Sequence, residues 1–144
     1  MADNTEENVP VIIRYFASKE VKPGETWKVY LHARDREGDM NRIVCLLEEP
    51  GEGTHPVSFI KIREDRRETL SGYVFLNTTT AYGFNFTGCR LTIQIQDKKG
   101  HLSKAVSFPL TLNPRASQDD PPPGTFQEQE LGPIQIPFPS GLRP

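Results

Sequence analysis

Four carboxylates in two predicted turns are the side chains of this sequence best suited to binding chemistry. Asp35, Glu37 and Asp39 alternate within one turn, and Asp97 opens a later turn. Calcium takes about six to eight oxygen ligands, several of them from carboxylates. Aspartate is also a common turn former, and the helix–loop–helix calcium spacing is absent. We predict no metal and no cofactor, with calcium binding by Asp35, Asp39 and Asp97 as the open alternative.

The two cysteines, Cys45 and Cys89, have the inward parity of their predicted strands. In a sandwich of the immunoglobulin type these strands are neighbours, so a disulfide is possible if the two residues lie directly opposite. The alternative, which we prefer without a secretion signal, is a pair of buried free thiols. Apolar surroundings raise a thiol pKa, which argues against a nucleophilic cysteine.

No catalytic motif accompanies these groups. The three histidines have no ligand spacing, and the serines lack a nucleophile-elbow context. Phosphate-binding and dinucleotide-binding glycine patterns are also absent. We therefore predict that the protein is not an enzyme and has no small-molecule substrate.

The charge balance argues against nucleic acid as a partner. Lysine and arginine number 17 against 19 acidic residues, a formal net charge of −2. The one basic cluster has acidic residues interleaved, which is typical of a solvated strand end and turn. Its bases are Lys61, Arg63, Arg66 and Arg67, and its acids are Glu64, Asp65 and Glu68.

The N-terminal residues are polar and acidic, without the pattern of a signal peptide. No apolar run approaches the roughly 20 residues of a membrane-spanning helix. We expect synthesis in the cytoplasm and no insertion into a membrane. Assembly into a particle, or export of a protein whose start has been trimmed, are the alternatives.

Alternating apolar and polar residues predict an all-β fold. The clearest strands are 27–34 and 89–96, each with one apolar and one wet face. Further strands are predicted at 11–16, 43–47, 57–62, 70–76 and 103–112. Seven short strands between turns predict a seven-stranded immunoglobulin-like sandwich over residues 10–112, after a flexible segment 1–9. Pro109 argues that the last strand lies at a sheet edge.

Residues 113–144 form the third predicted region, an extended proline-rich tail. They carry eight of the thirteen prolines, which excludes a regular helix or a central strand. Apolar residues are spaced along the tail, and three of them share one parity, as in a strand that docks on a surface. The predicted partner-binding residues are Leu131, Ile134, Ile136 and Phe138.

Three turn motifs resemble bacterial immunoglobulin-like modules of the PKD and cadherin-like kind. They are Val21-Lys22-Pro23-Gly24-Glu25, Asp35-Arg36-Glu37-Gly38-Asp39 and Gln96-Asp97-Lys98-Lys99-Gly100-His101. The resemblance covers roughly residues 10–112 and implies a sandwich that acts as a spacer, an adhesin or a decoration of a larger assembly. The Trp-Asp-Phe-Gly-Asp signature of PKD domains is absent.

Together these features predict a non-catalytic structural or assembly module of a larger complex. A surface filament, a virion component and an accessory subunit are the settings considered, and the tail would dock on a neighbouring subunit. The alternative is a soluble domain that recognises a carbohydrate or a protein through loops at one end of the sandwich.

Overall fold

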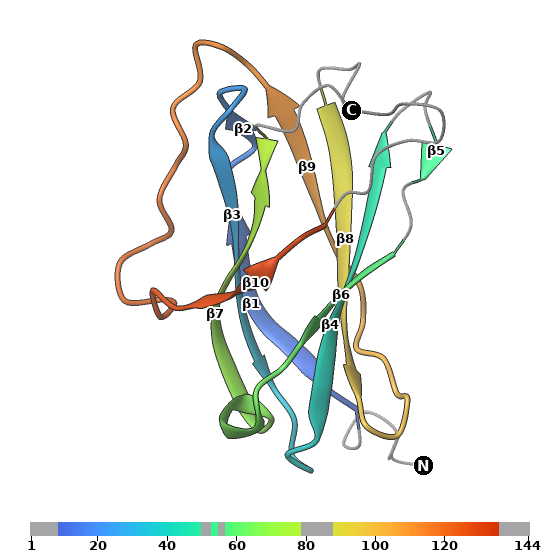
Figure 1. Ribbon diagram of the computed structural model, residues 1–144. Coiled ribbons are helices and arrows are strands. Elements are labelled where there is room, and N and C mark those ends of the chain that lie inside the picture. The colour runs from blue at the N-terminus through green and yellow to red at the C-terminus, as the bar shows by residue number, and fades with distance from the viewer. Residues whose placement is uncertain (1–8, 50–52, 55–56, 79–87, 136–144) are drawn as a thin grey trace, which may run out of the picture.

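The chain forms two β-sheets packed face to face, seen in a computed structural model that describes residues 9–49, 53–54, 57–78 and 88–135 (Figure 1). The first sheet has the order β1 (Val11–Ala17), β3 (Thr26–Arg34), β7 (Thr69–Asn77), β10 (Glu130–Pro133). The second has the order β2 (Glu20–Val21), β9 (Val106–Leu112), β8 (Gly88–Asp97), β4 (Met40–Glu49), β5 (Gly53–Thr54), and β6 (Ser58–Lys61) also pairs with β4. A short 3-10 helix, η1 (Glu64–Arg66), precedes β7.

The expected all-β sandwich is confirmed. Each of the seven predicted segments coincides with a strand, and the described residues contain three more, β2, β5 and β10. The first two are only two residues long, too short to show a period of two. No helix among the described residues is long and apolar enough to cross a membrane.

The core lies between the sheets and follows the predicted alternation. In β3, Trp27, Val29 and Leu31 are fully buried, and in β8 the same holds for Leu91 and Ile93. Burying apolar area contributes about 25 cal/mol per Å², so these inner faces are the main stabilising element. The one polar atom of the buried indole is satisfied, because Trp27 Nε1 donates to the Ser18 carbonyl oxygen at 2.8 Å.

The N-terminal strand switches sheets. Its first part, β1, pairs antiparallel with β3, and its second part, β2, pairs parallel with β9. A register shift in β1 leaves Ile12 opposite Ala33 and Tyr15 opposite Leu31, although they are three residues apart. The bulge therefore turns both side chains toward the buried residues of β3.

The last described segment returns to the first sheet. From the end of β9 the chain runs down the side next to β3 and β7, drawn in orange, and then crosses back as β10 (Figure 1). β10 pairs parallel with β7, and Ile134, which follows it, belongs to the hydrophobic core. The described part of the tail is thus packed on the chain's own sandwich.

Candidate functional site

Two of the four predicted partner-binding residues contact the sandwich of the same chain. Ile134 is only 6% exposed and Leu131 is half-buried against the core. The backbone is anchored on both sides of Leu131, since Tyr73 N donates to the Gln129 carbonyl at 2.9 Å and Ile134 N donates to the Phe75 carbonyl at 2.7 Å. The other two, Ile136 and Phe138, lie outside the described residues.

Two glycines make room for this docked segment. A Cβ on Gly72 of β7 would collide with the Gln129 carbonyl oxygen and lie 2.9 Å from the Leu131 side chain. A Cβ on Gly132 would lie 2.6 Å from the Ile60 side chain, at a φ of +151° that L residues rarely adopt. Because Gly72 and Gly132 have no side chain, the tail can pack in direct contact with the sandwich at these two positions.

Polar side chains hold the earlier part of the tail. The Gln118 side chain accepts a hydrogen bond from Lys28 N at 3.0 Å and donates one to the Thr26 carbonyl at 2.9 Å. Asp119 N donates to Ser18 Oγ at 3.1 Å, and Gln127 N donates to Ser71 Oγ at 3.0 Å. These contacts bridge some 56 to 101 positions of sequence and fix the tail along β3 and β7.

The tail also covers a tyrosine that the alternation assigns to the wet face of β3. Tyr30 is 5% exposed, with its ring centroid 5.5 Å from that of Phe126. Its hydroxyl donates to Glu128 Oε1 at 2.7 Å. Burial, and then the hydrogen bond and charge of Glu128, raise the pKa of Tyr30. The expectation of a wet face is wrong here because the tail supplies a third layer.

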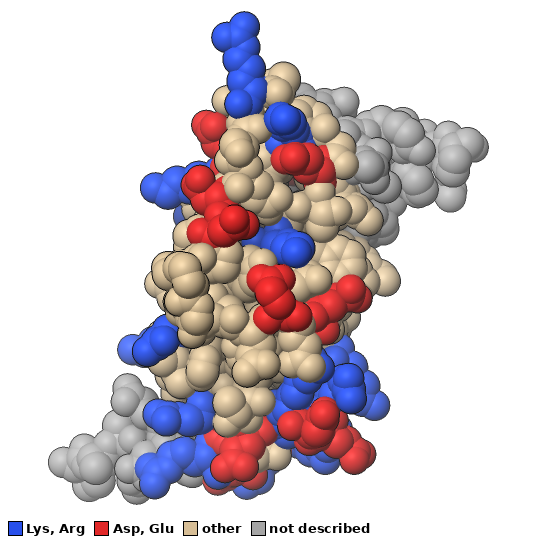
Figure 2. Space-filling model, turned by 90° about the vertical axis from the view of Figure 1, so that its left-hand side faces the viewer, with Lys and Arg blue, Asp and Glu red and all other residues tan. Residues whose placement is uncertain are grey.

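Figure 2 shows the side of the molecule along which the tail runs. Acidic and basic side chains are intermixed there with a broad uncharged surface, and both signs gather at the lower end. On this view of the described residues the mixed charges give no field of a single sign, in line with the near-neutral composition.

Three of the four predicted carboxylates meet at one end of the sandwich. Asp35 follows β3, Asp39 precedes β4 and Asp97 ends β8. One oxygen from each lies within 4.8 Å of the other two. The β4–β8 register places Met40 opposite Asp97, and Lys98 N donates to the Asp39 carbonyl at 2.9 Å. Strand pairing thus brings the two turns together.

The fourth predicted carboxylate takes a different partner. Glu37 Oε1 lies 3.0 Å from Lys99 Nζ, in an ion pair at the exposed rim. This pair raises the pKa of Lys99. Glu37 is therefore outside the cluster formed by Asp35, Asp39 and Asp97.

Both carboxylate oxygens of Asp97 have hydrogen-bonding neighbours in its own turn. Its Oδ1 accepts from Lys99 N at 3.0 Å and from His101 N at 2.8 Å. Its Oδ2 lies 3.0 Å from His101 Nδ1. These bonds shape the turn after β8, which is the ordinary structural use of an aspartate at this position.

The other two carboxylates are only partly satisfied. Asp35 is 1% exposed, and its Oδ1 accepts from Glu37 N at 3.1 Å. Asp35 Oδ2 and Asp39 Oδ1 are both buried and have no hydrogen-bond partner in the described part of the chain. Burial, and then the neighbouring carboxylate of Asp39, raise the pKa of Asp35 to about 6.

The strand register excludes a disulfide between the two cysteines. Cys45 lies opposite Ile93, whereas Cys89 lies opposite Leu110 at the other end of β8. Both are buried free thiols, as preferred from the sequence. Burial raises the pKa of each thiol to about 12.

We expect both thiols to react very slowly in the native protein. A rise in pKa from 9.0 to about 12 lowers the thiolate fraction roughly 1,000-fold at pH 8, and the thiolate is the reacting form. Labelling with a disulfide reagent, followed by mass spectrometry, should give two modified cysteines in denaturant and almost none without it. Fast native labelling of either residue would contradict its burial.

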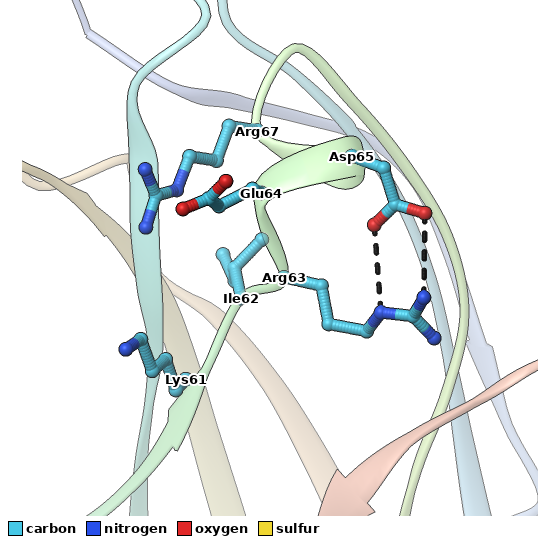
Figure 3. A pocket seen from close by; sticks show the side chains of 6 residues that line it. All are labelled: Lys61, Ile62, Arg63, Glu64, Asp65 and Arg67. Carbon is cyan, nitrogen blue, oxygen red and sulfur yellow. Dashed lines mark hydrogen bonds and ion pairs between the residues drawn. The ribbon is translucent and has the colours of Figure 1, made fainter.

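The basic cluster forms the wall of an open hollow of about 500 Å³ (Figure 3). Arg63 is paired with Asp65, with Nε–Oδ1 and Nη2–Oδ2 distances of 3.4 and 3.5 Å. The hollow lies at the end of β6 and is lined in part by residues of η1, which is the predicted strand end and turn. Arg66 departs from the expected solvated cluster, because it is only 9% exposed. The hollow is lined by Lys61, Ile62, Arg63, Glu64, Asp65 and Arg67.

The opposite edge of the first sheet is open. β1 pairs with β3, and it has no strand on its other side among the described residues. Val11, Ile13 and Tyr15 of β1 are 45%, 40% and 51% exposed. An exposed edge strand with apolar side chains is a ready template for pairing with another chain. No signal in the sequence distinguished this strand from the others.

A scan against protein-family models finds no match to this chain. A search of curated proteins also finds no match.

Proposed function

We propose that this protein is a non-catalytic structural module that assembles with a second copy of itself through β1. The observation that carries the proposal is the open β1 edge with the exposed side chains of Val11 and Ile13. Strand addition at such an edge supplies backbone hydrogen bonds, and the apolar side chains supply buried area.

The arrangement of the strands supports an immunoglobulin-like sandwich. β1, β3 and β7 follow one another in one sheet, and β4, β8 and β9 in the other, which matches the A-B-E and C-F-G strands of that fold. In that fold strand D lies beside strand E. We infer that β10 takes this place, because β6 pairs with β4 instead.

A second copy is the occupant that the edges favour. The described edge strands of the first sheet are β1 and β10, and of these β1 is the one that exposes large apolar side chains, whereas β10 contains a proline that cannot donate a backbone hydrogen bond. Two β1 strands related by a two-fold axis would pair antiparallel and give a closed dimer, since the same surface serves both partners. Ile136 and Phe138 keep their expected role as contacts to a neighbouring subunit within this proposal.

The described surface features support a role without catalysis. In the hollow beside η1, the Arg63–Asp65 pair is exposed and satisfied by its own ion pair. The cysteine thiols are buried and strongly disfavour the thiolate, so they are unsuited to nucleophilic chemistry.

The test is the solution mass of wild type and of the Val11→Lys/Ile13→Lys variant. At a high protein concentration we expect wild type to approach twice 16.3 kDa by light scattering, and the variant to remain at 16.3 kDa, because lysine blocks edge pairing. The matched control, Val57→Lys/Leu102→Lys, changes two residues that are each 45% exposed but lie outside β1, and it should dimerise like wild type. A monomeric wild type at about 1 mM would refute self-assembly, since this corresponds to a very weak interface.

A further inference from the structure

The end of the sandwich that holds Asp35, Asp39 and Asp97 has the features of a cation site. Three strand ends and two turns converge there, and each aspartate offers an oxygen within 4.8 Å of the others. We propose that these three carboxylates bind one hard divalent cation of the calcium class. The site is built from a single chain, and it does not depend on the dimer proposed above.

The orphan oxygens point to a ligand independently of the clustering. Asp35 is only 1% exposed. Its Oδ2 atom and the Oδ1 atom of Asp39 are both buried, and neither has a hydrogen-bond partner among the described residues. An unpaired buried carboxylate oxygen is costly, because it has lost water without a replacement. A bound cation supplies the missing partner to both oxygens at once.

The geometry and the donor atoms favour calcium. Oxygens bound to one Ca²⁺ lie about 2.4 Å from it, so two of them are at most roughly 4.8 Å apart. The three aspartate oxygens satisfy that limit. Carboxylate oxygen is a hard donor, and the nearby His101 nitrogen Nδ1 is already turned to Asp97 at 3.0 Å. Calcium accepts several further oxygens, including those of water.

The experiment uses the full chain, first treated with a chelator and then dialysed. Calorimetric titration with Ca²⁺ alone should show one binding event per chain. Saturating Ca²⁺ should raise the melting temperature by about 5–10 °C, because a ligand that binds only the folded state stabilises it. No heat and no shift at millimolar Ca²⁺ would overturn the proposal, as would a response to Zn²⁺ without one to Ca²⁺.

The melting temperature of the Asp39→Asn variant should differ from that of wild type in opposite directions without and with Ca²⁺. Without cation it should melt above wild type, because one of two neighbouring, mutually repelling carboxylates has become neutral. With Ca²⁺ it should melt below wild type, because the site is lost. Asp35→Asn provides the same comparison at the more buried position. The control, Asp65→Asn, neutralises an exposed carboxylate of η1 and should keep the full calcium response. An unchanged calcium response in both Asp39→Asn and Asp35→Asn would overturn the site.

Discussion

A chain that ends at Leu112 is expected to lose about 3–6 kcal/mol of unfolding free energy relative to the full chain. The loss has two sources. Ile134 and Leu131 no longer cover the core. The hydrogen bonds that the Tyr73 amide and the Phe75 carbonyl make to the tail are lost, so these two groups bond to water instead. Denaturant unfolding followed by tryptophan fluorescence measures this change, because Trp27 is fully buried in the sandwich.

Point variants separate the core contact from a general effect of shortening. Ile134→Ala in the full chain should cost about 2–4 kcal/mol, as is usual when a buried isoleucine is truncated. Arg115→Ala, at an exposed position of the same tail, should leave stability within about 0.5 kcal/mol of wild type. If the chain ending at Leu112 were as stable as the full chain, β10 would not be part of the cooperative fold.

Gly72→Ala is expected to destabilise the full chain by about 1–3 kcal/mol. The new Cβ would collide with the Gln129 carbonyl oxygen and press on Leu131, so the tail must shift away from β7. The same substitution in the chain ending at Leu112 should be neutral or stabilising, since glycine within a strand costs roughly 0.5–1 kcal/mol relative to alanine. The difference between the two backgrounds measures the coupling of Gly72 to the tail.

Gly100→Ala is the matched control for this cycle. Gly100 has a φ of +93°, and nothing lies within 4 Å of the position that a Cβ would take, so alanine there is strained without colliding. Its cost should be equal in the full and the shortened chain. An equal cost for Gly72→Ala in both backgrounds would show that Gly72 is required by β7 itself and not by the tail.

The sequence specifies the two-sheet body well because its strands carry local patterns. In β3 and β8, apolar residues alternate over nine and ten residues, and the turns between strands contain their usual glycines and aspartates. The convergence of Asp35, Asp39 and Asp97 follows from two such turns sharing one end of the sandwich. Their orphan oxygens could not be foreseen, because hydrogen-bond satisfaction depends on the packing around each atom.

The sequence did not predict that the tail packs on its own sandwich, because β10 pairs with a strand that is distant in the sequence. β10 is four residues long, contains a glycine and a proline, and pairs parallel with a strand more than 50 positions earlier. One local sign was present. Gly72 interrupts an otherwise continuous strand, and an isolated glycine in a strand commonly marks close approach of another backbone. Tyr30, an aromatic residue on the nominally wet face of β3, pointed to the same cover.

The pairing of β10 with β7 has a consequence for the order in which the strands can pair during synthesis. A ribosome delivers residues 11–112 before Ile134, so every strand of the body can pair while the edge of β7 still lacks its neighbour. Until the tail emerges, the nascent body exposes that edge and the apolar seat beneath it, a state prone to pairing with other chains. The final step joins segments distant in sequence, and such steps are slow. We therefore expect the docking of β10 on β7 to be the last step of sheet formation, and to cover the apolar surface that is exposed before it.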